Sequence, residues 1–125
     1  MAASSSEAVM RNVRDSRLVG SEAFALAKSR VAVSKPLSQA EWLQAEEELG
    51  CILVGFKEAL YRAHNISEHE YRICLLVKMG FSNKEIGILI FRAANAVSLA
   101  RKRLYKKLTG RDGTASDFDD LIKSL

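Results

Sequence analysis

A helix start signal occurs four times in the sequence, and this repeat limits the fold more than any other feature. At Ser38, Ser67 and Ser82 a serine is followed three residues later by a glutamate, and at Ser116 by an aspartate. The serine oxygen can accept a hydrogen bond from a free backbone N–H, while the carboxylate reaches back to the N–H of the serine. An apolar pattern with steps of three and four residues follows each signal. The sequence therefore predicts four helices that begin at these positions.

The amino-acid composition favours the same fold class. The 125 residues include one proline and seven glycines, and 48% of them are hydrophobic. Such a chain can form long helices and a packed core, so we expect an all-α protein. Gly80 should end the helix from Ser67 as a left-handed cap. Gly50 and Gly55 are the two positions at which we expect the helix from Ser38 to break.

Two features indicate a cytoplasmic protein without a membrane segment. The longest apolar runs, "CILVGF" and "IGILIF", are far shorter than the roughly 18 residues of a membrane span, and the start "MAASSSEAVMRNVRD" lacks the apolar stretch of a secretory signal. Cys51 and Cys74 fall on apolar helix faces, so we expect both to be reduced thiols in the core.

The chain divides into three stretches by composition. Residues 1–37 read as a loose or partly helical extension and linker, which ends where Pro36 disfavours a helical conformation of the preceding residue. Residues 38–65 form a helical connector. Residues 66–125 contain the last three start signals, and we expect them to form a domain of their own.

The positive charge is concentrated in one part of the chain. The formal net charge is only +4. The stretch 92–107 contains six cations and no acid: Arg92, Arg101, Lys102, Arg103, Lys106 and Lys107. A patch of this kind suits a polyanion, although a solvated helix face would give the same pattern.

Two helices are expected to lie very close together here, one from Ser82 and one over 93–108. Only "FRA" separates them, which is roughly the length of the turn in a helix-turn-helix. Gly87 would let the two helices cross closely, and Ala93 offers no side-chain cap to the second helix. A helical projection of that second helix puts an apolar stripe on one side: Val97, Arg101, Leu104 and Leu108. Its other side is polar and cationic, as expected of a helix that enters the major groove of DNA.

This part of the sequence resembles a known family. The stretch "NISEHEYRICLLVKMGFSNKEIGILIFRAANAVSLARKRLYKKL" resembles the LuxR-type (GerE-like) helix-turn-helix of bacterial transcription regulators, over residues 66–125. The preceding "EWLQAEEELGCILVGFKEAL" resembles the helical segment before this domain in larger sensor-regulators. The resemblance implies a four-helix LuxR-type domain with an N-terminal helical extension. It also implies a sequence-specific, DNA-binding transcription regulator, or the C-terminal reader fragment of one.

The candidate contacts combine this resemblance with the chemistry of each side chain. The residues expected to meet DNA bases are Asn95, Ser98, Leu99 and Lys102. The residues expected to meet phosphate are Ser82, Asn83, Lys84, Arg92, Arg101, Arg103 and Lys106. Arg101 projects near the apolar stripe, so its stem should pack while its guanidinium reaches the rim. Two residues depart from the family pattern, because Phe91 stands where a small residue is common and Arg92 where an apolar one is.

Other functions remain as alternatives. The chain could be a helical protein-interaction module that docks through Leu99 and the last helix, without binding DNA, or a sigma-factor-like promoter reader that contacts RNA polymerase. Double-stranded DNA is the main expected partner, and a second copy of the chain, bound through 116–125 as a homodimer, is a further one. No phosphate loop, nucleophile motif or metal-ligand spacing stands out, so we expect no enzyme activity, no cofactor and no metal site.

Overall fold

The computed structural model describes residues 14–62 and 64–125, and all regular structure in these ranges is helical, which confirms the expected fold class. A helical stretch over 14–19 comes first. The helices that follow are α2 (Glu22–Ala32), α3 (Gln39–Ile52), α4 (Phe56–Tyr61), α5 (Glu68–Lys78), α6 (Asn83–Ile90), α7 (Ala94–Thr109) and α8 (Ala115–Ser124). None of the helices in the described ranges is long and apolar enough to cross a membrane.

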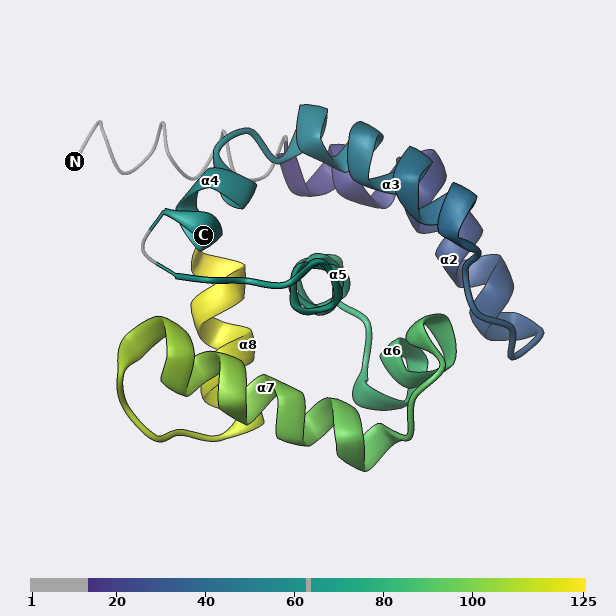
Figure 1. Cartoon of the computed structure of the whole chain (residues 1–125). Coiled ribbons are helices and arrows are strands. Elements are labelled where there is room, and N and C mark those ends of the chain that lie inside the picture. The colour runs from purple at the N-terminus through teal and green to yellow at the C-terminus, as the bar shows by residue number, and fades with distance from the viewer. Residues whose placement is uncertain (1–13, 63) are drawn as a thin grey trace.

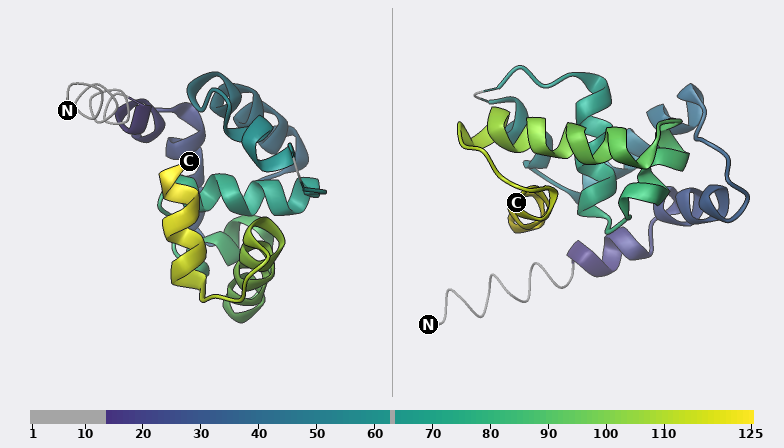
Figure 2. Two further views of the ribbon diagram at one scale, coloured as in Figure 1. Left: turned by 90° about the vertical axis from the view of Figure 1, so that its left-hand side faces the viewer. Right: turned by 90° about the horizontal axis from the view of Figure 1, so that it is seen from below.

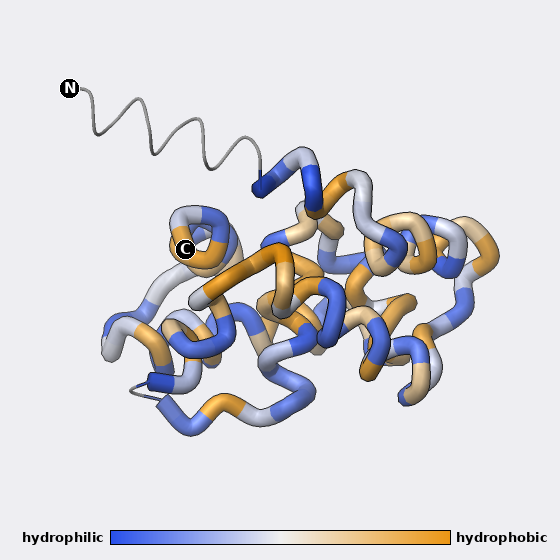
Figure 3. Tube along the Cα trace, turned by 90° about the horizontal axis from the view of Figure 1, so that it is seen from above, coloured by the Kyte–Doolittle hydropathy of each residue, from blue (hydrophilic) through white to orange (hydrophobic). Residues whose placement is uncertain are grey.

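Helix α5 forms the centre of the molecule. In Figure 1 it is viewed end-on, with α3, α6, α7 and α8 around it. Its side chains from Ile73 to Val77 are at most 1% exposed. Lys78, at the end of α5, donates from Nζ to the carbonyl oxygen of Lys123 in the last turn of α8, at 2.9 Å. The surrounding helices are amphipathic, and orange and blue positions alternate along them in Figure 3.

Three of the four expected helix starts are confirmed. Ser38, Ser67 and Ser82 each cap a helix through a reciprocal pair of hydrogen bonds with the glutamate three residues later. The fourth start is wrong by two residues, because Thr114 and not Ser116 caps α8. The Thr114 hydroxyl accepts from the N–H of Asp117 at 3.1 Å, and the Asp117 carboxylate accepts from the N–H of Thr114 at 2.8 Å. Threonine, like serine, is a favoured residue for this capping role.

The glycines act differently from one another. Gly55 has φ +83° and begins α4, so the helix from Ser38 does break there. Gly80 follows α5 with φ +91°, in agreement with the expected left-handed cap. The expected break at Gly50 is wrong, because α3 continues through this residue to Ile52.

The two cysteines also differ. Both are free thiols, and Cys74 is fully buried, which raises its pKa to about 12. The expectation that Cys51 lies in the core is wrong, because its side chain is exposed. It stands two residues after the buried Leu49, and two residues turn an α-helix by roughly 200°. Cys51 therefore points away from the side that α3 buries.

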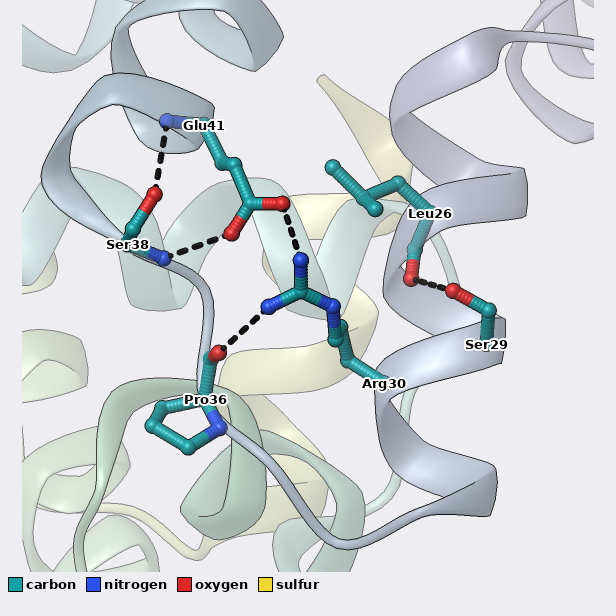
Figure 4. Close-up of polar contacts among 6 residues, drawn as sticks. All are labelled: Leu26, Ser29, Arg30, Pro36, Ser38 and Glu41. Carbon is teal, nitrogen blue, oxygen red and sulfur yellow. Dashed lines mark hydrogen bonds and ion pairs between the residues drawn. The ribbon is translucent and has the colours of Figure 1, made fainter.

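The N-terminal helices pack onto the rest of the molecule. The rings of Phe24 in α2 and Phe81 before α6 lie 5.5 Å apart, and the N–H of Leu37 donates to the carbonyl oxygen of Leu89 in α6 at 3.2 Å. Figure 4 shows how the α2–α3 connection is held: Arg30 donates to the Glu41 carboxylate and, at 3.2 Å, to the carbonyl oxygen of Pro36.

One hydrophobic cluster runs through all three stretches into which the sequence was divided. It includes Ala27 from the first, Leu49 from the second and Ile86 from the third. Of the stretch 1–37, expected to be a loose or partly helical extension and linker, residues 14–19 and α2 are helical, and residues 1–13 lie outside the described residues.

Candidate nucleic-acid interface

Helices α6 and α7 form a tight helix–turn–helix unit. Only Phe91, Arg92 and Ala93 separate them, and the N–H of Arg92 donates to the carbonyl oxygen of Gly87 at 2.8 Å. A Cβ atom at Gly87 would lie 2.4 Å from the carbonyl oxygen of Arg92, which is far inside van der Waals contact. Glycine is therefore required for this close approach, as the sequence predicts.

Helix α7 lies across an outer face of the molecule. In the right-hand view of Figure 2 it crosses the side nearest the viewer. Its inner side consists of Val97, Arg101 and Leu104, which are 1%, 4% and 0% exposed. Eight residues of α7 are exposed, namely Ala94, Asn95, Ala96, Leu99, Lys102, Arg103, Lys106 and Lys107. The last of them, Lys107, pairs with Glu70 of α5 at 3.0 Å. Ser98 is half-buried at one edge. All four candidate base-contacting residues thus share one face.

The cations of this face are largely free of acidic partners. Within the described ranges, neither Lys102 nor Arg103 forms an ion pair. Lys106 lies 3.5 Å from Asp112, but both side chains are strongly exposed, at 65% and 91%. An ion pair between two such exposed groups contributes little free energy in water. Helix α7 contains no carboxylate of its own, so its outer side is a cationic surface that an anion can approach.

The side chain of Arg101 lies elsewhere than the sequence predicted. Its side chain is 5% exposed and does not reach the rim. The guanidinium donates to the carbonyl oxygen of Phe81 and to the carboxylate of Asp119, both at 3.2 Å. Burial lowers the pKa of Arg101, and the neighbouring Asp119 partly offsets this. Arg101 thus joins α7 to the α5–α6 connection and to α8, and it is not placed to contact phosphate.

The first turn of α6 supplies a second cluster of candidate residues. Ser82 is exposed and Lys84 is exposed, whereas Asn83 is half-buried. The hydroxyl of Ser82 accepts from the N–H of Glu85 at 3.2 Å, so it acts as a helix cap and keeps its own O–H for a further acceptor. Lys84 and Arg92 line one groove together with the start of α7. The fold therefore brings these two phosphate candidates to one side.

The turn between α6 and α7 has an unusual backbone. Phe91 adopts the left-handed conformation, with φ 58° and ψ 58°, and its side chain is 78% exposed. Bulky residues rarely adopt this conformation. Arg92 follows it and is exposed as well. Ala93 then caps α7 without any side-chain hydrogen bond, as the sequence predicts, which leaves the first N–H groups of α7 open.

One residue of this region escaped the sequence analysis. His69 in α5 lines a small groove beside α7, together with Arg92 and Arg103. Burial lowers the pKa of His69, and the charges of Arg92 and Arg72 lower it further. No spacing in the sequence connects His69 with Arg92, because they meet only when α5 packs against α7.

Comparisons with protein-family models, with curated proteins and with solved structures gave no match to this chain.

Proposed function

We propose that this protein binds double-stranded DNA and inserts α7 into the major groove. The observation that carries the proposal is the outer side of α7, which is exposed, cationic and free of carboxylates. The major groove of B-DNA is wide enough for one α-helix, and the hydrogen-bonding groups of the bases are distinct there. The inner side of α7 packs into the core through Val97 and Leu104, so its outer side is the one left to meet the groove.

The candidate residues then take two roles. Asn95, Ser98, Leu99 and Lys102 face the base edges, because they lie on one side of α7. The outer side of α7, which carries Asn95, Leu99, Lys102 and Arg103, is called its outer ridge. Basic side chains around this ridge meet the phosphates: Arg103 and Lys106 from α7, and Lys84 and Arg92 beside it, with Ser82 and Asn83 at the edge. Arg101 is left out of this set, because its guanidinium is already bonded inside the protein. Phosphate contacts fix the position of a protein on DNA, whereas base contacts select the sequence.

We infer from this activity, and from the resemblance to LuxR-type domains, a cytoplasmic transcription regulator of bacterial type or the reader portion of one. Pairing of two copies through α8 is part of the same proposal. The apolar side of α8 contributes Phe118 and Ile122 to the core, so a second copy would have to use its other side, where Leu121 is half-buried and Leu125 is 37% exposed.

A protein-interaction module is the second candidate, and two exposed apolar residues favour it. Phe91 is 78% exposed and Leu99 is 50% exposed, and both lie on the α6–α7 unit. A protein partner that covers them would bind through apolar contact. Its affinity would then depend weakly on salt, whereas phosphate contacts make DNA binding fall steeply as salt rises. A sigma-factor-like reader would in addition retain RNA polymerase in a pull-down.

Fluorescence anisotropy with a labelled random duplex, measured at several salt concentrations, tests the proposal. Four phosphate-contacting cations predict a slope of log K against log salt of about −3.6. Lys106→Gln should weaken binding to all duplexes alike and reduce the slope by about 1. Lys102→Gln should instead relax the base preference of the selected duplex pool.

Lys57→Gln is the matched control, because it removes the same charge from an exposed residue on α4, which belongs neither to the proposed DNA surface nor to the proposed pairing helix. It should leave both the affinity and the slope unchanged. The proposal is wrong if the wild-type protein binds no duplex, or if Lys106→Gln and Lys57→Gln have equal effects. If the protein instead binds a protein partner through Leu99, with an affinity that does not depend on salt, the interaction module is favoured.

A further inference from the structure

Leu99 occupies the middle of the outer ridge of α7. One helical turn before it stands Asn95, and one turn after it stand Lys102 and Arg103, all of them exposed. Exposure by itself would mean little, because single apolar residues are common on protein surfaces. The position of this leucine is what matters: it is 50% exposed at the centre of a polar ridge, where a side chain that enters the groove would meet the base edges first.

The chemistry of the ridge limits which bases it can select. Ahead of Lys102, the outer residues of α7 are Ala94, Asn95, Ala96, Ser98 and Leu99, and none of them can give guanine the pair of donors that arginine gives. The Asn95 amide can both donate to and accept from adenine. An aliphatic side chain has only one favourable partner on the floor of the major groove, the C5-methyl group of a pyrimidine.

We propose that Leu99 is a specificity-determining residue that contacts the C5-methyl group of a pyrimidine in the major groove. This inference rests on the proposed function, because it needs α7 in the groove. Thymine and 5-methylcytosine both carry such a methyl group. The amide of Asn95, one turn away, pairs with adenine, so an A·T pair beside the contact fits the ridge best.

The energetic consequence is small but measurable. Removing one methyl group from an apolar contact weakens affinity by about fourfold. Replacing a single thymine by deoxyuridine removes this methyl group and leaves every hydrogen-bonding group of the base in place. The loss should appear at one position of the bound site and should disappear when Leu99 is shortened to alanine.

The experiment uses the full chain and one duplex recovered from a random pool by selection for binding. Each thymine is replaced in turn by deoxyuridine, and affinities are measured for the wild-type protein, Leu99→Ala and Leu43→Ala. Leu43 is the matched control, since it is 55% exposed but lies on α3. Circular dichroism verifies that all three proteins are folded. In a second arm, the sensitive thymine pair is replaced by a cytosine or 5-methylcytosine pair, which shows whether the methyl group is read on both bases.

The expected result is one position with about fourfold weaker binding to deoxyuridine, for the wild type and Leu43→Ala but not for Leu99→Ala. The inference is overturned if the duplex binds with steep salt dependence but no thymine position is sensitive, or if Leu99→Ala keeps the full thymine preference. In these two cases the proposed function stands. If the protein binds no duplex at all, both proposals fail.

Discussion

Alanine substitution at two helical glycines should have opposite effects on stability. Gly50 lies inside α3, and a Cβ atom there would meet nothing within 4 Å. Gly87 lies inside α6, and a Cβ atom there would lie 2.4 Å from the carbonyl oxygen of Arg92. Alanine is favoured over glycine in a helix by about 1 kcal/mol, and this gain applies to both positions. The difference between the two variants therefore measures the cost of the close approach between α6 and the turn.

The cost at Gly87 has two parts. The carbonyl of Arg92 must move by at least ~1.0 Å to reach ordinary van der Waals contact, and it belongs to the backbone rather than to a flexible side chain. Overpacking of this kind costs about 1–3 kcal/mol. The movement also stretches the hydrogen bond from the N–H of Arg92 to the carbonyl oxygen of Gly87, which is worth about 1 kcal/mol.

Gly50→Ala should therefore stabilise the protein by about 1 kcal/mol, and Gly87→Ala should destabilise it by about 1–3 kcal/mol. For a chain of this size, 1 kcal/mol corresponds to about 3–5 °C in Tm. Urea unfolding followed by circular dichroism gives the free energies, and thermal unfolding gives Tm. The reasoning is refuted if Gly87→Ala is as stable as the wild type, or if both variants shift Tm in the same direction.

Three further predictions follow from the interior contacts. Arg101→Met should lower the free energy of unfolding in urea by about 3 kcal/mol, because it leaves buried polar partners unpaired. The affinity of the folded variant for DNA should stay within about twofold of the wild type. A large loss of affinity would instead show that Arg101 contacts phosphate. In a thiol titration of the native protein, Cys51 should react fast and Cys74 only after unfolding, because one is exposed and the other buried with a pKa raised to about 12; equal rates would contradict the fold of α3 and α5. Burial acts to raise the pKa of Glu70, but the N–H of Ser67 and the ammonium of Lys107 outweigh it, so the pKa is lowered overall. A carboxylate of this kind stabilises the folded state above its unfolded pKa of about 4.3, and the stability is lost as pH falls below that value. Glu70→Gln should flatten the fall in Tm between about pH 5 and 3, and an unchanged profile would show that the pair contributes nothing.

Sequence reasoning was most successful where a local rule decides the structure. A serine and a glutamate three residues apart favour a helix start through hydrogen bonds that they make with each other's backbone, so the starts at Ser38, Ser67 and Ser82 were found. The same rule placed the last helix at Ser116, because the sequence offers two overlapping hydroxyl–carboxylate pairs there. Only the packing of Phe118 and Ile122 against the core selects the pair that begins at Thr114.

The candidate site was less accessible to sequence reasoning, because its geometry depends on contacts between distant residues. A helical projection put Arg101 near the apolar stripe of α7, but it could not supply the buried carbonyl of Phe81 or the carboxylate of Asp119 that hold the guanidinium. His69 was missed for the same reason, since it reaches α7 through tertiary packing alone. The exposed face of α7 was found because it depends on the helical period only.

Two local rules are broken at the same end of α7, and this supports the proposed interface. Phe91 adopts a left-handed conformation that costs a residue with a side chain about 1–2 kcal/mol. Ala93 leaves α7 without a side-chain cap, at a cost of about 1 kcal/mol, whereas five other described helices begin at a serine or threonine cap. Strain of this kind tends to gather at functional sites, where the surrounding structure maintains it. Here both costs fall beside Arg92, at the end of the helix that a duplex would meet, and the open N–H groups of α7 would gain acceptors from its phosphates.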